Sequence, residues 1–272
     1  MNFFEKLETI LIKPTPLEKI EAFKNFYEQY QAGTFAMETT TPPKVFEKPS
    51  YERYCKIIAP QKVPKRKNMH LREGQINLLH AIAHIEYSAI DMALDAAYRF
   101  RDLPQKYYDD WLSVASDEVR HFEMLEALLI ELDSEYGAVE VHNAMFEASQ
   151  RTQTLLDRMA VVPRYLEANG LDATPEILTK LKRLQKGEML DKIIEALELI
   201  LAEEVDHVLK GDYWFEYACD KAKVEKSSYF DIIEKYYPRA FVRERTLNVK
   251  ARQKAGFSCS EIKFMNSSAQ CQ

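Results

Sequence analysis

Glycine and cysteine are both scarce in this sequence, with 7 glycines and 4 cysteines among 272 residues. The cysteines, at positions 55, 219, 259 and 271, form no Cys-x-x-Cys pair, so neither a zinc site nor a redox dithiol is predicted. The sequence contains no glycine-rich phosphate loop, no Gly-x-Ser-x-Gly elbow and no Cys-His nucleophile. These absences direct attention away from nucleotide binding and covalent catalysis.

Long apolar runs are absent as well. None reaches the ~18–20 residues that a membrane-spanning helix needs, and the first six residues lack the basic start and apolar core of a signal peptide. We therefore expect a cytoplasmic protein with no membrane partner. A net charge of −6 and a pI of about 5.7 give no support to nucleic-acid binding, although tRNA stays open as a partner.

Helix-forming residues dominate what is present, because 46% of the residues are hydrophobic and 29% are charged. Together with little glycine, this composition predicts an all-α fold. We expect N-terminal helices and an extended connector over residues 1–68, a four-helix bundle over 69–222, and a C-terminal extension packed on it over 223–272. The expected helices are Asn2–Ile12, Pro16–Gln31, Leu71–Arg101, Pro104–Asp133, Phe146–Ala168, a short helix from Pro175 to Lys186, Glu188–Lys221 and Tyr229–Tyr237.

The third long helix contains residues that can interrupt it. Pro163 lies within it and predicts a kink. Asn169-Gly170 predicts a left-handed stop, and Pro175 suits the first turn of a new helix. Residues after Met265 are polar, so we expect a frayed C-terminal tail.

Two segments share the pattern acid-Glu-Val-x-His, 86 residues apart (204 − 118). Glu118 and His121 stand three residues apart, so a helix places both on one face, and Glu204 and His207 repeat the arrangement. Four-helix bundles that hold two metal ions take a Glu-x-x-His pair from each of two helices and one Glu from each of the other two. A single pair is common as a solvated Glu beside a surface His. Two copies in apolar helical segments favour a metal site.

The first long helix offers Glu73, Glu86, Asp91 and Asp95 as a further carboxylate, and we favour Glu86. It lies in the apolar run Ala81–Tyr87, where an unpaired carboxylate would be costly. A metal ion would compensate its charge, and a salt bridge to an arginine is the alternative. His80 and His84 lie about 120° and 160° around the helix from Glu86. We expect both to be buried, hydrogen-bonded histidines and not ligands.

Glu147 and Glu167 compete to be the carboxylate of the third long helix. Antiparallel helices bring two residues level when the turn lies midway between them in sequence. For Glu86 and Glu118 the midpoint is 102, in the expected turn. For Glu204 the midpoint is 185.5 with Glu167 and 175.5 with Glu147, and both fall at helix breaks. Fewer residues separate Glu204 from Glu167 than from Glu147, which favours Glu167, and Glu147 stays an alternative.

Asp117 and Glu203 precede the motif glutamates and stand four residues before the histidines, so they compete as ligands. We prefer them as acids that do not bind the metal directly, but accept a proton from a ligating imidazole or pair with Arg120. Carboxylates and imidazoles together suit iron and manganese. The expected cofactor is two iron ions, with manganese or a mixed pair as alternatives.

The order Glu, Glu-x-x-His, Glu, Glu-x-x-His on four long helices resembles the ferritin-like diiron superfamily. Six stretches more closely resemble an uncharacterised bacterial family, the domain-of-unknown-function family four-fifty-five, over about residues 45–265. They are Leu79–Glu86, Tyr98–Phe100, Asp117–Phe122, Val162–Asp172, His207–Phe215 and Asn248–Arg252. The resemblance implies a ferritin-like four-helix bundle whose metal ligands are Glu86, Glu118, His121, Glu167, Glu204 and His207.

No single reaction comes with this resemblance, because superfamily relatives oxidise ferrous iron, reduce peroxides, form radicals or hydroxylate substrates, including a tRNA base. We expect first a dinuclear iron or iron/manganese oxidoreductase that activates dioxygen or peroxide on an unidentified small-molecule substrate. The alternatives are a ferroxidase or iron-storage protein, and a metal-free helical scaffold for a partner. A homodimer is also open, and a sizing column would separate it from a storage shell.

Overall fold

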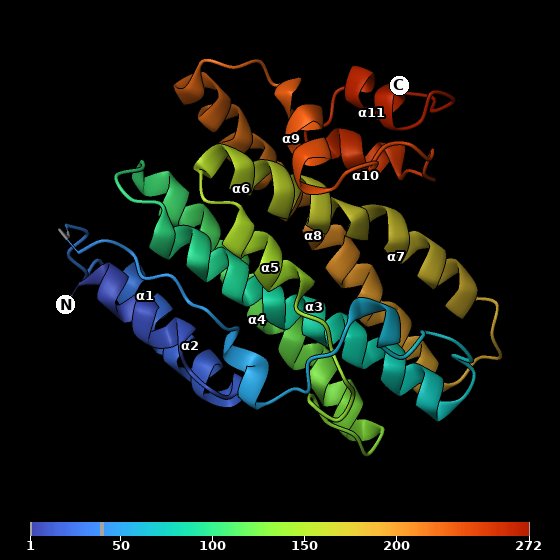
Figure 1. Ribbon diagram of the computed structural model, residues 1–272. Coiled ribbons are helices and arrows are strands. Elements are labelled where there is room, and N and C mark those ends of the chain that lie inside the picture. Colours follow the sequence, from blue (N-terminus) through green and yellow to red (C-terminus); the bar gives the residue numbers. More distant parts are fainter. Residues whose placement is uncertain (1, 39–40, 272) are drawn as a thin grey trace. The chain divides into compact units, whose positions relative to one another are not determined.

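The computed structural model describes residues 2–38 and 41–271. Every regular element in these ranges is a helix, and the isolated bridges Asn2–Ala36 and Ile57–Val141 extend into no strand there. The all-α expectation is therefore confirmed for the described residues (Figure 1). Within the same ranges, no helix has the length and apolarity needed to cross a membrane. The chain divides into two compact units, Met1–Glu147 and Ala148–Gln272.

The first unit is built on two long helices, α3 and α4, which lie side by side, with α1 packed on α3 and α2 on α4 (Figure 1). Its elements are α1 (Phe3–Leu11), α2 (Pro16–Gln31), the short 3-10 turns η1 (Ser50–Arg53) and η2 (Pro60–Lys62), α3 (Arg72–Arg99), α4 (Gln105–Glu131) and the start of α5 (Ala144–Arg151). The four helices expected before residue 134 are all present. Each begins and ends within two residues of the expected position, which is the usual uncertainty of helix ends.

A tight turn joins α3 to α4. Asp102 adopts a positive φ of 58° there, a conformation that aspartate tolerates better than most residues. The hydroxyls of Tyr107 and Tyr108 donate to the carbonyls of Ala96 and Phe100, both at 3.2 Å. The bond from Tyr108 satisfies the carbonyl of Phe100, the C-cap residue of α3, and the bond from Tyr107 adds a second donor to the carbonyl of Ala96, which already accepts from the backbone N–H of Phe100. The turn therefore fixes the level at which residues of α3 face residues of α4.

A buried ion pair ties α2 to α3. Lys19 is fully buried, and its ammonium group donates to the carboxylate of Asp91, to Oγ of Ser50 at 2.7 Å and to the carbonyl of Leu11 at 3.2 Å. Three acceptors match the three N–H bonds of the ammonium group. The N-terminal helices are thereby held on the α3–α4 pair.

The second unit is built on α8 (Glu188–Ala222). Three consecutive elements pack against it, namely α6 (Leu155–Val161), the π-helical turn η3 (Val162–Glu167) and α7 (Ala168–Leu181). Three shorter helices follow, α9 (Ser228–Tyr236), α10 (Val249–Lys254) and α11 (Cys259–Met265). The expected helices Glu188–Lys221 and Tyr229–Tyr237 correspond closely to α8 and α9.

The third long helix differs from expectation. The predicted stop at Asn169-Gly170 is wrong, because α7 continues through both residues and through Pro175. Proline has no N–H, so the carbonyl of Leu171 lacks its usual helical donor. The side-chain amide of Asn248 donates to that carbonyl instead, at 3.2 Å. A contact from the C-terminal segment thus stabilises a helix that the local sequence would end.

The interruption expected at Pro163 takes the form of the π-turn η3. A π-helix bonds residue i to residue i+5, and such a turn accommodates a local break in the α-helical pattern. A Cβ atom built on Gly211 of α8 would lie 2.2 Å from Cβ of Pro163. Glycine at position 211 therefore allows η3 to approach α8 this closely.

Arg164 of η3 holds the C-terminal helices through its buried guanidinium group. That group lies 2.7 Å from Asp212 of α8 and 2.8 Å from Glu261 of α11. It also lies 4.4 to 4.9 Å from the ring centres of three aromatic residues, Phe215, Tyr229 and Phe257. Charge pairing and cation–π contacts therefore meet at one side chain.

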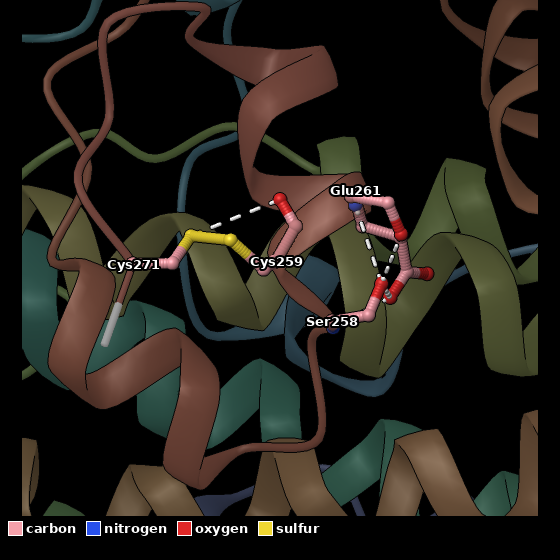
Figure 2. The surroundings of a disulfide bond; sticks show 5 residues. Ser258, Cys259, Glu261 and Cys271 are labelled. Carbon is pink, nitrogen blue, oxygen red and sulfur yellow. Dashed lines mark hydrogen bonds between the residues drawn. A yellow bond between two sulfur atoms is a disulfide. The ribbon is translucent and has the colours of Figure 1, made fainter.

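The tail that we expected to be frayed is bonded to α11. Cys271 forms a disulfide with Cys259, the first residue of that helix, as Figure 2 shows. Ser258 and Glu261 form a reciprocal capping box at the same end of α11. The sequence reasoning missed the disulfide because two cysteines 12 residues apart match no recognised pattern.

Candidate metal centre

Glu86 of α3 and the Glu118-x-x-His121 pair of α4 meet inside the first unit. One ligand atom from each residue lies within 4.8 Å of the others. Nδ1 of His121 is 3.1 Å from Oε2 of Glu86 and 3.5 Å from Oε2 of Glu118. The structure therefore brings together the three ligands that the sequence predicts for this unit.

Local geometry explains why these residues meet. Glu118 and His121 share a face of α4 because they stand three residues apart. Asp102 lies midway in sequence between Glu86 and Glu118 and occupies the α3–α4 turn with its positive φ. The two carboxylates consequently reach the same level of the helix pair.

All three side chains are removed from solvent, with 4%, 1% and 0% of Glu86, Glu118 and His121 exposed. Burial alone lowers the pKa of His121, but hydrogen bonds to Glu118 and Glu86 outweigh it and raise this pKa to about 11. Without metal, a buried imidazolium therefore lies between two carboxylates. The site stabilises positive charge at that position, where a metal ion would replace the proton.

The second unit carries the repeated pair on α8. Nδ1 of His207 lies 3.2 Å from Oε1 of Glu204, so the histidine faces its motif glutamate as His121 does. His207 is fully buried and Glu204 is half-buried. Glu167, the last residue of η3, is also half-buried. π-helical turns are frequent at functional sites, which is consistent with a role for this residue.

The competing carboxylates have other surroundings. Glu147 of α5 is exposed to solvent. Asp117 accepts a hydrogen bond from Arg120 at 2.9 Å, which confirms the pairing proposed from the sequence. Glu203 is half-buried. Exposure makes Glu147 a weaker candidate than Glu167, because water competes with a metal for an exposed carboxylate.

His80 and His84 are buried and hydrogen bonded, as predicted. Nε2 of His80 accepts bonds from the backbone N–H groups of Gly137 at 2.8 Å and Val139 at 3.3 Å. The two nitrogens of His84 contact the Tyr136 hydroxyl and the His142 carbonyl. Burial lowers the pKa of each imidazole to about 4, so both are neutral near pH 7.

Sequence reasoning missed an aromatic cluster beside the ligands. Tyr87 directly follows Glu86, and Phe122 directly follows His121. The rings of these two residues lie 5.2 Å apart, and each packs against the ring of Tyr136. An aromatic residue after each ligand was a visible signal, but nothing in the sequence placed Tyr136 between them.

The donor set fits iron or manganese. Imidazole nitrogen and carboxylate oxygen are ligands that both metals accept, and no cysteine lies in the group. Buried carboxylates also require compensating positive charge. The residues present in the first unit therefore suit a divalent or trivalent metal ion.

Comparison with known proteins places the chain in one family. Residues 12–263 match the family described as "Protein of unknown function (DUF455)". An uncharacterised protein from Haemophilus influenzae is 32% identical over 276 residues, which cover 97% of this chain and 93% of that protein. No solved structure matches the chain. The match over most of its length shows that the chain belongs to the DUF455 family.

Proposed function

We propose that this protein binds two iron ions, or an iron/manganese pair, and acts as an oxidoreductase toward dioxygen or peroxide. The observation that carries the proposal is the buried group of Glu86, Glu118 and His121, whose ligand atoms lie within 4.8 Å of one another. Such a group is costly without a cation.

The repeated motif supports two ions. Glu204 and His207 repeat the contact between a histidine Nδ1 and its motif glutamate. With Glu167 as the remaining carboxylate, the six proposed ligands comprise two equivalent sets of one histidine and two glutamates. This composition matches the ligand count of ferritin-like four-helix bundles that hold two metal ions, and we propose that architecture here.

The chain's own residues would perform three tasks. Nδ1 of His121 and of His207 would bind metal as neutral imidazole, so metal binding releases the proton that His121 holds in the metal-free protein. The carboxylates would balance the charge. The bound pair would supply one-electron steps that glutamate and histidine side chains cannot supply alone, and the burial of Glu118 would exclude water.

Metal stoichiometry tests the proposal. Protein purified without a metal-binding tag is loaded anaerobically with ferrous iron, desalted and analysed for iron per chain. We expect close to two ions in the wild type and at most one in His121→Ala, with a lower melting temperature when metal is present. Asp117→Asn, which removes an acid bonded to Arg120, is the matched control and should keep both ions.

The third-helix carboxylate is tested in the same assay. Glu167→Ala should lose iron, and Glu147→Ala should keep two ions because its side chain is exposed. Loss from the Glu147 variant together with full occupancy in the Glu167 variant would overturn this assignment. A wild-type protein that binds no iron or manganese would overturn the proposed function itself.

A further inference from the structure

A small cavity lies in the first unit, on a different face of α3 from Glu86. Four residues of this helix line it, Asn77, His80, Ala81 and His84. Their spacings of three and four residues place them on one helix face. That face is turned from Glu86 by roughly 120° to 180°, at 3.6 residues per turn. The cavity has a volume of about 30 Å³, which is room for about two water molecules.

Two loop segments, residues 63–64 and 139–142, form the rest of the cavity wall. The backbone N–H of Val141 donates to the carbonyl of Lys56 at 3.0 Å, which holds the second segment in place. Glu140 accepts a hydrogen bond from the ammonium group of Lys56 at 2.7 Å, so the charge of this lining carboxylate is already paired. Most residues of the two segments are half-buried, so the cavity reaches the protein surface.

Backbone donors fix which nitrogen of His80 carries its hydrogen. Nε2 accepts bonds from the backbone N–H groups of Gly137 at 2.8 Å and Val139 at 3.3 Å. A backbone N–H can only donate, so Nε2 is bare and the hydrogen is on Nδ1. Nδ1 makes no hydrogen bond to the residues that the structure describes. The buried ring of His80 therefore offers one N–H donor to an occupant of the cavity.

Two further donors belong to the lining. Nδ1 of His142 accepts a bond from the backbone N–H of Ala144 at 3.3 Å, so its hydrogen is on Nε2. Among the described residues, neither this Nε2 nor the side-chain amide of Asn77 has a hydrogen-bond partner. A metal ion binds a bare imidazole nitrogen, whereas His80 and His142 each have an N–H to offer. The lining therefore suits a hydrogen-bond acceptor and not a metal ion.

The charges near the cavity favour an anionic acceptor. The segment of residues 62–67 contains four basic residues and no acidic one, and its second and third residues line the cavity. Burial and the positive charge of Arg66 both lower the pKa of His142, whereas Glu147 raises it. The charge of Arg66 therefore acts on the cavity wall.

We propose that this cavity binds the carboxylate group of a small organic acid through Nδ1–H of His80, Nε2–H of His142 and the amide of Asn77. A carboxylate accepts several hydrogen bonds through its two oxygens, and bonds to a charged acceptor are the stronger kind. Its planar head is also smaller than a phosphate group, which suits the limited volume. Because the cavity reaches the surface, the rest of the acid extends into solvent. The proposal is independent of the proposed function, since no metal ligand lines the cavity.

Nitrogen NMR of the metal-free, full-length protein tests the site with acetate as the probe. Before acetate is added, we expect His80 to be protonated at Nδ1 and His142 at Nε2. Acetate should shift both N–H resonances until they saturate, and sodium chloride at the same ionic strength should not. Phosphate should bind more weakly than acetate.

Variants separate binding from folding. Asn77→Leu removes a side-chain amide without a hydrogen-bond partner among the described residues, so the melting temperature should change little. Loss of one hydrogen bond to a charged acceptor should weaken acetate binding about tenfold or more. His142→Phe, at a half-buried position, should also weaken binding. Asn25→Leu, an exposed position of α2, is the matched control and should bind acetate as the wild type does.

Four results would each overturn the proposed carboxylate site. They are shifts with acetate no larger than with chloride, tighter binding of phosphate than of acetate, wild-type affinity for acetate in folded Asn77→Leu, and a hydrogen on Nε2 of His80. Because the measurements use metal-free protein, none of these results bears on the proposed function.

Discussion

Replacing Arg164 with leucine should destabilise the second unit strongly. The guanidinium group is fully buried and faces the carboxylates of Asp212 and Glu261 at 2.7 and 2.8 Å. Removing one partner of a buried ion pair costs about 3–5 kcal/mol, because the remaining charge stays buried. Here two carboxylates lose their shared cation, although Lys226, 2.7 Å from Asp212, retains part of the compensation. We therefore expect the free energy of unfolding to fall by about 3–5 kcal/mol, and not by the sum of two such losses.

Urea unfolding, monitored by tryptophan fluorescence, measures the destabilisation of the second unit. Of the two tryptophans, Trp214 lies in α8 and Trp111 in α4, so a Trp111→Phe background makes the signal specific to the second unit. Arg183→Leu removes an exposed arginine of the same unit and should change the unfolding free energy by less than about 0.5 kcal/mol. An Arg164 variant that unfolds within about 1 kcal/mol of this control would refute the reasoning.

Two further predictions concern the packing of η3 and the charge of the ligand group. Gly211→Ala should destabilise by about 1–3 kcal/mol, because the new methyl group would lie 2.2 Å from Cβ of Pro163. Gly170→Ala meets no atom within 4 Å and should be neutral or stabilising by up to about 1 kcal/mol, and equal melting temperatures for the two variants would contradict this. In metal-free protein, the pKa of His121 is raised to about 11, above its unfolded value of about 6.5. The stability that protonated His121 contributes is therefore complete below about pH 6.5 and is lost as pH rises through 11. Melting temperatures measured in a chelator should fall across this window, and they should fall less in His121→Gln.

Local sequence patterns predicted the elements that depend on local interactions. The helices α2, α3, α4 and α8 follow from a composition rich in helix-forming residues and poor in glycine, and their ends lie close to the expected positions. The meeting of Glu86 with Glu118 followed from counting residues on either side of the α3–α4 turn.

Long-range contacts account for what the sequence did not reveal. The helix through Pro175 depends on Asn248, which is 77 residues from the carbonyl that it bonds. The contact between Tyr136 and His84 joins residues 52 positions apart, with the whole of α4 between them in the sequence. The pairing of Cys259 with Cys271 likewise depends on the path of the tail.

Mössbauer spectroscopy of the iron-loaded protein tests the central claim most directly. Protein loaded with the Mössbauer-active isotope to saturation is oxidised with dioxygen, and its spectrum is recorded in weak and strong magnetic fields. If the six proposed ligands Glu86, Glu118, His121, Glu167, Glu204 and His207 hold one dinuclear centre, the loaded protein contains two ferric ions per chain, coupled into a diamagnetic ground state. Magnetically isolated ferric ions, or fewer than two bound per chain in the wild type, would contradict the account.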